Sequence, residues 1–349
     1  ERPYQEAAAK ALNLDLELTT VDGSAFPDDL MRLTYCQDQP VIGAAMIPMY
    51  SVSRLAAKSV KVCLGGQSAD EIFGGYARYA IVKPGQTLRS MFAAADPAPR
   101  TGGESTTSPV GGNLLKQLAD PRNLRRAARV LSFDNWQTRY FENFAKVPES
   151  RWARLFADPT IVSRRRARDR YDEALTRSAA IDPGDKILHW DQQSYLTGLF
   201  QQDDRMSMAH GLESRVPLAD PRIVRFARQT RFDLKVRSGA SKWILRRAVA
   251  DVLPPFVLNR RKVGFDTPAA AWMRGRHKDF VRDLLLSSRA RARGFWAPQG
   301  IESTLADSRS PYWFDVVWKV ASIEAWASCF LDRPPQMSHA ADDHVLQSA

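Results

Sequence analysis

Cysteine and histidine are scarce in this sequence of 349 residues, which contains three cysteines and five histidines. Cys36, Cys63 and Cys329 are widely spaced and odd in number, so they indicate neither a disulfide framework nor a metal-ligand spacing. No apolar run approaches the ~20 residues of a membrane span, and the first residues do not show the charged-then-apolar pattern of a secretory leader. We therefore expect a cytoplasmic protein with reduced thiols and no membrane partner.

Acidic residues are outnumbered by basic residues, 39 against 50, which gives a formal net charge of +11. Much of the excess is arginine, in clusters at residues 122–129 and 164–170. A basic balance suits acidic ligands or nucleic acid, but these clusters contain no interleaved aromatic residues and match no nucleic-acid-binding motif. We interpret the clusters as solvated helix faces and expect no nucleic-acid partner.

The rest of the composition, 44% hydrophobic and 26% charged residues, is that of a folded globular protein. Residues 3–12 have helical periodicity, residues 15–21 alternate as a strand does, and the apolar positions of residues 43–58 predict a helix packed on the sheet. Residues 60–64 form an apolar run that is typical of a buried strand. This β–α–β order predicts a parallel sheet and an α/β fold.

Residues 64–76 are the most informative stretch, and they read LGGQSADEIFGGY. Two glycines follow the predicted strand, and the Ser-Ala-Asp-Glu sequence of residues 68–71 can cap and open a helix. A strand that breaks at glycines before a helix exposes backbone N–H groups at the carboxyl end of a sheet, where anionic ligands bind. The acidic pair Asp70-Glu71 would repel a free phosphate, so a metal–nucleotide is the better candidate ligand.

This stretch resembles the second nucleotide-site motif of the asparagine synthetase family, and two later stretches agree with the family in the same order. Residues 203–220, DDRMSMAHGLESRVPLAD, resemble the family's Asp-Arg-x-Ser-Met-Ala…Glu-x-Arg-Val-Pro-Phe-Leu-Asp block. Residues 242–268 are similar to its Lys-x-x-Leu-Arg…Leu-Pro…Arg-x-Lys-x-Gly-Phe-x-x-Pro block. Three ordered matches are specific, and the resemblance covers roughly residues 1–330.

Two family features do not occur here: the N-terminal cysteine of a glutaminase domain and the Ser-Gly-Gly-x-Asp-Ser pyrophosphate loop. The resemblance therefore implies a parallel-sheet, adenine-nucleotide α-hydrolase-like (PP-loop ATP pyrophosphatase) core, truncated at its N-terminus and followed by a mostly helical C-terminal part. Residues 1–85 would be the remainder of this core, and residues 86–113, rich in small residues and proline, a mobile surface excursion. Residues 114–330 would be the helical part with the second half of the active site, and residues 331–349 a frayed tail.

The resemblance implies an ATP-dependent carbon–nitrogen ligase that adenylates the aspartate side chain and transfers ammonia to it, giving asparagine, AMP and pyrophosphate. Ammonia would come from glutamine through an upstream glutaminase domain, and this excised fragment would be inactive. ATP and Mg²⁺ are the implied cofactors, and a homodimer is possible.

The family's catalytic lysine matches Lys262, which would meet pyrophosphate and the developing oxyanion. Gly65 and Gly66 match the ATP-contacting dipeptide, and Asp70 matches the acidic residue near pyrophosphate and magnesium. Lys242 matches a second lysine of the family block, for which a helical lysine that snorkels or forms an ion pair is an equal alternative.

Gln67 lies where some members have a glutamate that is linked to formation of the adenylate. Glutamine keeps an acceptor oxygen but cannot act as a base, so we assign it an orienting role at the catalytic centre. Ser68 replaces a usual glycine and would stiffen the turn if that position has a positive φ.

The charged residues of the second block are more typical of structure than of catalysis. Asp203, Asp204 and Arg205 lie on a predicted helix, and Glu213 with Arg215 on the turn after it, at spacings that suit ion pairs. We assign Arg215 and Asp220 to the helix-to-loop junction. His189 and His210 precede the Lys262 segment, and His277 follows it. None of them is near the glycine turn in sequence, so we interpret all three as structural.

Two alternatives remain open from the sequence. One is another amide-forming member of the superfamily, of the β-lactam synthetase or lasso-peptide cyclase type, since the carboxylate pocket cannot be read here. The other is a non-catalytic partner subunit, because the pyrophosphate loop does not occur.

Overall fold

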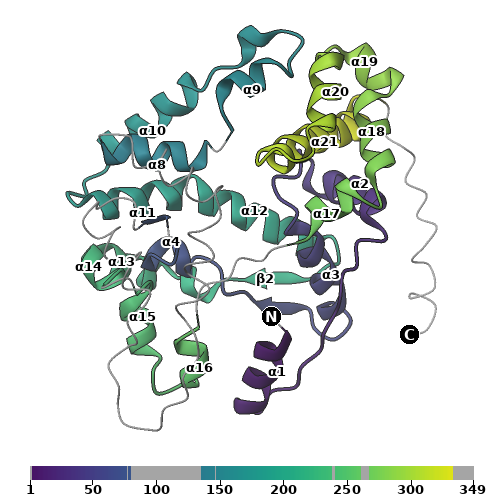
Figure 1. The fold of residues 1–349 in the computed structure, drawn as a ribbon. Coiled ribbons are helices and arrows are strands. Elements are labelled where there is room, and N and C mark those ends of the chain that lie inside the picture. Colours follow the sequence, from purple (N-terminus) through teal and green to yellow (C-terminus); the bar gives the residue numbers. More distant parts are fainter. Residues whose placement is uncertain are drawn as a thin grey trace.

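The computed structural model describes residues 2–76, 78–79, 135–145, 147–237, 240–260 and 267–332. The protein is mainly helical, and a short parallel sheet lies among the helices (Figure 1). The first part contains α1 (Arg2–Ala11), α2 (Phe26–Gln37), α3 (Met46–Ala56), β1 (Val62–Leu64) and α4 (Ala69–Phe73).

The middle part contains α8 (Trp136–Phe144), α9 (Glu149–Ala153), η2 (Pro159–Ile161), α10 (Arg165–Arg177), α11 (Pro183–Gln193), α12 (Tyr195–Met208), β2 (Glu213–Arg215), η3 (Pro217–Ala219), α13 (Pro221–Gln229), α14 (Phe232–Lys235), α15 (Trp243–Ala248) and α16 (Pro255–Leu258). The last part contains α17 (Ala269–Arg274), α18 (Lys278–Leu286), α19 (Ser288–Arg293), α20 (Pro298–Ala306) and α21 (Trp313–Phe330).

The predicted helices at residues 3–12 and 43–58 are confirmed as α1 and α3, and helical structure continues to the end of α21. The predicted excursion at residues 86–113 lies outside the described residues, as does the tail beyond residue 332.

The sheet consists of β1 and β2, which run parallel with Val62 opposite Glu213 and Leu64 opposite Arg215. A parallel sheet is therefore confirmed, but two details of the prediction are wrong. Leu64 is 75% exposed and Val62 43% exposed, so β1 is not a buried strand. The segment at residues 213–215, which was predicted as a turn, is the second strand. A strand assignment from residue types alone misses such a charged segment because its neighbours decide the pairing.

The predicted strand at residues 15–21 is wrong. This segment pairs with no strand in the part of the chain that the structure describes. Leu14, Leu16 and Leu18 are exposed along it. Alternating residues form a strand only where a neighbouring strand supplies hydrogen bonds, and no strand of the described ranges does so here.

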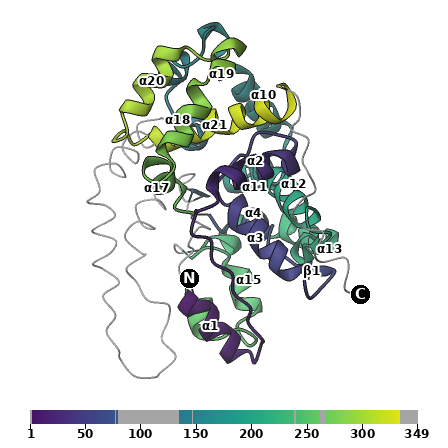
Figure 2. The same ribbon diagram turned by 90° about the vertical axis from the view of Figure 1, so that its right-hand side faces the viewer.

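The main hydrophobic core joins the beginning of the described chain to its end. Phe26, Leu30 and Leu33 of α2 are buried against α21, whose Val317 and Ala321 are also buried. The indole Nε1 of Trp318 in α21 donates to the Val41 carbonyl at 3.0 Å. Figure 2 shows α2 beneath α18 and α21. This core anchors the segment that leads into α3 and β1.

Two smaller clusters position α4. Ile72 and Phe73 of α4 are buried with Ala227 of α13, and Ile244 and Leu245 of α15 pack against them. Another cluster lies between α8, α10, α11 and α14 and includes the buried Tyr79, Tyr140 and Tyr171. In Figure 1, α4 accordingly lies between α11, α13 and α15.

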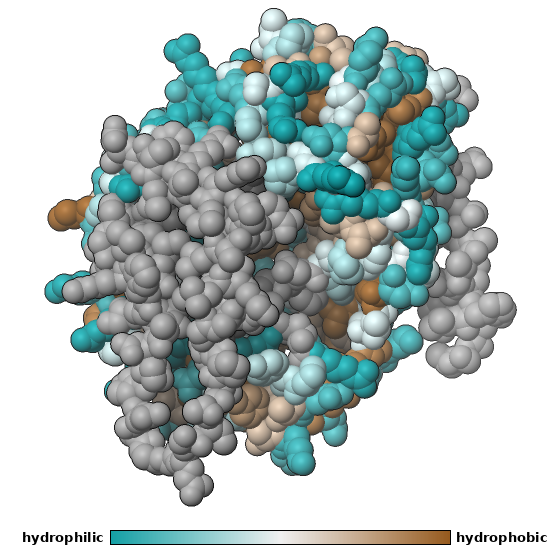
Figure 3. All heavy atoms as spheres, in the orientation of Figure 1, coloured by the Kyte–Doolittle hydropathy of each residue, from teal (hydrophilic) through white to brown (hydrophobic). Residues whose placement is uncertain are grey.

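The arginine-rich helix α10 is a solvated helix face, as predicted. Its charges pair along the helix: Arg165 with Asp169, Arg168 with Asp172 and Arg177 with Glu173. Figure 3 shows hydrophilic residues over much of the described surface on this side of the molecule. The cluster at residues 122–129 lies outside the described residues.

None of the helices in the described ranges is both long enough and apolar enough to cross a membrane.

Candidate functional site

The glycine turn lies directly at the carboxyl end of β1. The Gly65 N–H donates to the Arg215 carbonyl at 2.7 Å and thereby continues the ladder beyond the last strand residue. Gly66 is exposed, and a Cβ placed on it would have no atom within 4 Å. The chain therefore presents bare backbone at the carboxyl end of a parallel strand, a position where ligands bind in open α/β sheets.

Gln67 and Ser68 complete the turn, and Ser68 has a left-handed backbone with φ +68°. The positive φ that was considered for this position is confirmed. For a residue with a Cβ, this conformation costs about 1–2 kcal/mol. Gln67 Oε1 and Ser68 Oγ are buried, and neither has a hydrogen-bond partner among the described residues. Such oxygens are uncommon in native proteins and mark places where a further group can bind.

Asp70 and Lys242 form an ion pair, with 3.0 Å between Oδ1 and Nζ. Their side chains are 14% and 22% exposed, so water screens the pair only in part. Lys242 precedes α15 and also has a left-handed backbone, with φ +53°. Gly75 lies against the pair, since a Cβ on Gly75 would overlap Asp70 Oδ1 and Lys242 Cε. The structure thus brings Asp70 and Lys242 together, and it shows Lys242 in an ion pair.

Arg246, one turn after Lys242, holds the chain that leads toward Lys262. Its Nε donates to the Ser241 carbonyl at 2.9 Å, and its two other nitrogens donate to the carbonyls of Leu258 and Arg260. Burial lowers the pKa of the Arg246 guanidinium, whereas the negative charge of Asp70 raises it. Lys262 itself lies outside the described residues.

A buried polar network supports α4 from the side of α11. Asp191 of α11 is fully buried, and its Oδ2 accepts from Arg78 Nη2, the Tyr79 hydroxyl and the Tyr140 hydroxyl, each at 2.7 Å. The Arg78 guanidinium also stacks on Tyr76, 3.9 Å from the ring centroid. Burial, and then the charge of Asp191, raise the pKa of Tyr79 and Tyr140 well above the ordinary value, so both phenols stay protonated donors.

The same network reaches the residue next to Asp70. The Tyr76 hydroxyl donates to Glu71 Oε1, and Glu71 is 1% exposed. Burial raises the pKa of Glu71, and the hydrogen bond from Tyr76 offsets this only in part. The sequence analysis missed this network, although Tyr76 ends the motif and Arg78 and Tyr79 follow it closely. No local pattern indicates Asp191, the partner of Arg78 and Tyr79, because it lies far away in the sequence.

Several charged side chains of the second block, residues 203–220, hold the structure around the turn through hydrogen bonds and ion pairs. Asp203 of α12 accepts from the Ser214 hydroxyl at 2.6 Å, beside Gly65. Glu213 and Arg215 form an exposed ion pair, as predicted. Asp220 accepts from the Arg222 N–H and caps α13, so it lies at the start of that helix rather than where α12 passes into its loop.

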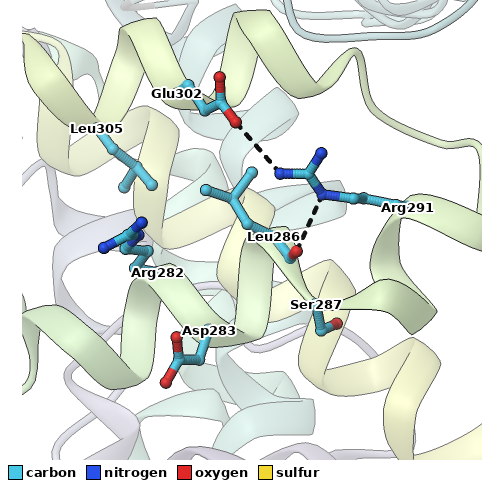
Figure 4. A pocket seen from close by; sticks show the side chains of 7 residues that line it. All are labelled: Arg282, Asp283, Leu286, Ser287, Arg291, Glu302 and Leu305. Carbon is cyan, nitrogen blue, oxygen red and sulfur yellow. Dashed lines mark hydrogen bonds and ion pairs between the residues drawn. The ribbon is translucent and has the colours of Figure 1, made fainter.

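Two histidines have contacts away from the turn, and a surface hollow lies elsewhere again. His277 contacts the Gly23 carbonyl at 2.7 Å, and the His210 ring lies 4.3 Å from that of Tyr50. The hollow, about 660 Å³, lies between α18, α19 and α20 (Figure 4). Arg291 in it pairs with Glu302. Within the described ranges, no three or more His, Cys, Asp or Glu residues are grouped so that they could hold a metal ion.

Comparison with known proteins gives consistent similarities. A family model described as asparagine synthase matches residues 1–328. A Bacillus subtilis (strain 168) protein named asparagine synthetase (glutamine-hydrolyzing) 1 is 27% identical over 349 residues, which covers 97% of this chain and 52% of the relative. A putative asparagine synthetase (glutamine-hydrolyzing) of Mycobacterium bovis is 29% identical over 269 residues, 77% of this chain and 39% of the relative. The chain thus spans about half the length of the Bacillus relative and a smaller share of the Mycobacterium relative.

Gly75→Ala should break the Asp70–Lys242 pair, because the new methyl group occupies the space of both side chains. Overpacking of this kind typically costs about 1–3 kcal/mol of stability. Gly66→Ala is the matched control, since nothing lies within 4 Å of its Cβ position. Denaturant unfolding should show a lower midpoint for Gly75→Ala only. A Gly75→Ala protein as stable as the wild type would contradict this view of the pair.

Glu71→Gln should stabilise the protein at neutral pH. The pKa of Glu71 is raised above its ordinary 4.5, so its contribution to stability is present below pH 4.5 and is lost as the pH rises through the raised value. A glutamine is neutral throughout and escapes this loss. Thermal unfolding across the acid-to-neutral range should therefore show a higher Tm for Glu71→Gln at neutral pH, with a difference that shrinks toward pH 4.5. A difference that does not change with pH would count against a buried, ionising Glu71.

Proposed function

The chain belongs to the asparagine synthase family, and on this premise we propose that it is the synthetase portion of a glutamine-dependent asparagine synthetase. In this reaction an oxygen of the aspartate side-chain carboxylate attacks the α-phosphorus of ATP and expels pyrophosphate, and ammonia then displaces AMP from the acyl-adenylate to give asparagine. In this proposal, a glutaminase domain that is not part of residues 1–349 releases the ammonia from glutamine.

The observation that carries the proposal is the convergence of the three sequence blocks at one turn. The first block meets the second through the β1–β2 pairing, in which Gly65 bonds to the Arg215 carbonyl. The first block meets the third through the Asp70–Lys242 ion pair. A fold that gathers bare backbone, a carboxylate and a lysine at the end of a parallel strand suits a nucleotide with its metal ion.

The roles of the named residues follow from the charge that the reaction develops. Both steps build negative charge, first on the leaving phosphates and then on the tetrahedral oxyanion, and fixed cations stabilise such charge. We assign this role to Lys262, and Arg246 supports it by holding the carbonyls of Leu258 and Arg260. Gly65 and Gly66 would let the nucleotide approach the backbone, while Gln67 would orient it.

The turn also fits a magnesium ion of the kind that accompanies ATP. Mg²⁺ is bound through one or two carboxylates together with substrate phosphates and keeps several waters, so it needs no dense acidic cluster. Asp70 offers a carboxylate, and the buried Gln67 Oε1 and Ser68 Oγ are oxygens without a partner among the described residues. Asp70 would hold the ion, which neutralises phosphate charge when bound, and Lys242 would stay beside the phosphates.

The remaining parts of the synthetase are proposals as well. We place residues 1–85 in a PP-loop type nucleotide core whose pyrophosphate loop lies upstream, and residues 114–330 in the helical second half of the active site. The lengths of the relatives support an arrangement of this kind, since this chain covers 52% of the Bacillus protein.

The reaction is tested with the protein as its gene encodes it, supplied with Mg-ATP, ammonia and one carboxylic acid at a time. We expect aspartate to give asparagine, AMP and pyrophosphate in equal amounts. Residues 1–349 alone should bind Mg-ATP weakly and make no asparagine. Pyrophosphate release with a different acid and none with aspartate would contradict the substrate and favour another amide-forming ligase of the superfamily.

Lys262→Ala should reduce ammonia-dependent asparagine synthesis by about 10²–10³-fold, because it removes one preorganised charge from the developing negative charge. Lys262→Arg should restore little activity, since a planar guanidinium does not replace a compact ammonium. Lys278→Ala is the control, because Lys278 is an exposed lysine at the start of α18. Product formation is measured by chromatography. Near-wild-type synthesis by Lys262→Ala would show that the lysine is wrongly assigned.

A further inference from the structure

Ser68 carries two unfavourable features that no described residue offsets. Its backbone has φ +68°, a conformation in which glycine is relaxed and a residue with a Cβ is strained. Its side chain is 1% exposed, yet the hydroxyl has no hydrogen-bond partner among the described residues and does not cap α4. A glycine would remove both features, so the structural role of the turn does not explain a serine.

The features around Ser68 point to a ligand. Gln67 Oε1, in the preceding residue, is buried and likewise has no partner in the described part of the chain. An amide oxygen can only accept a hydrogen bond, whereas a hydroxyl can accept or donate one. With the Asp70 carboxylate two residues further on, the turn carries three oxygen-bearing side chains within four residues, which suits a group with hydrogen-bond donors. Hydrogen bonds made in such a buried position are stronger than exposed ones.

We propose that Ser68 is a further ligand-binding residue of the turn, whose hydroxyl binds the magnesium–nucleotide. The proposal deepens the function proposed above and rests on it. Two parts of the ligand have donors of the required kind: the waters that Mg²⁺ keeps and the amino or hydroxyl groups of the nucleotide. In both cases the serine binds ligand at the expense of the stability of the free protein, as strained residues at functional sites do.

If Ser68 binds the ligand, replacing it should raise the stability of the free protein and lower the affinity for Mg-ATP. A purely structural serine would not produce these opposite changes. Ser68→Gly relieves the backbone and removes the unpaired hydroxyl, so its Tm without ligand should rise by about 2–4 °C. Its affinity for Mg-ATP should fall by about three- to tenfold, the usual effect of one lost hydrogen bond. Ser68→Ala also removes the unpaired hydroxyl but keeps the strained backbone, so it should lose the same affinity with a smaller gain in Tm than Ser68→Gly.

Asn13→Gly serves as the matched control. Asn13 is exposed and also has a positive φ of 51°, but it lies in the loop after α1. Relief of its backbone should not weaken Mg-ATP binding. The experiment measures Tm without ligand and calorimetric affinity for ATP, with magnesium and with EDTA, on the protein as its gene encodes it.

The outcomes show whether the Ser68 hydroxyl binds the hydrated ion or the nucleotide, or whether only the backbone matters. A loss of affinity in both Ser68 variants that requires magnesium assigns the hydroxyl to the hydrated ion, and a loss that persists in EDTA assigns it to the nucleotide. Equal affinity of wild type and both variants would overturn the proposal, as would a fall in Tm for Ser68→Gly. A loss in Ser68→Gly alone would also overturn it, because the backbone rather than the hydroxyl would then matter. A wild type that does not bind Mg-ATP would contradict the proposed function itself.

Discussion

The ion pair between Asp70 and Lys242 is the contact on which the arrangement of the site depends. It fixes the start of α15 against α4, at 3.0 Å between Oδ1 and Nζ, and Gly75 leaves the space that it needs. Because α4 has only five residues, it could not hold its own orientation by helix formation alone. The pair, the packing of Ile72 and Phe73, and the β1–β2 ladder together determine where the glycine turn points.

Behind this pair, the Asp191 network gives the turn a rigid base. A fully buried carboxylate is tolerated because Arg78 neutralises it and two tyrosine hydroxyls donate to it. Removing one partner of a buried pair typically costs about 3–5 kcal/mol, so the network resists rearrangement. It connects α11 through Arg78 and Tyr76 to Glu71, the neighbour of Asp70. The strain at Ser68 and Lys242 can persist because the surroundings on both sides are held in this way.

Local features were predictable from the sequence, and pairings between distant segments were not. The glycine turn and the helices at residues 2–11 and 46–56 follow from turn chemistry and from helical periodicity, which act over a few residues. The strand at residues 15–21 was wrong, and the strand at residues 213–215 was missed, because strand formation depends on the neighbour. Asp191 was missed for the same reason: its partners Arg78 and Tyr79 meet it only after the chain has folded.

The claim that residues 65–70 and Lys242 bind the nucleotide is tested most directly by hydrogen–deuterium exchange of backbone amides with and without Mg-ATP. The Gly65 N–H already donates to the Arg215 carbonyl, so it is the N–H groups after Gly65 in the turn that would donate to the ligand, and the start of α15 would be held more firmly. We therefore expect slower exchange in peptides that cover residues 65–73 and 242–246, and unchanged exchange in α18. Slower exchange only around the hollow between α18 and α20, with the turn unchanged, would contradict the claim.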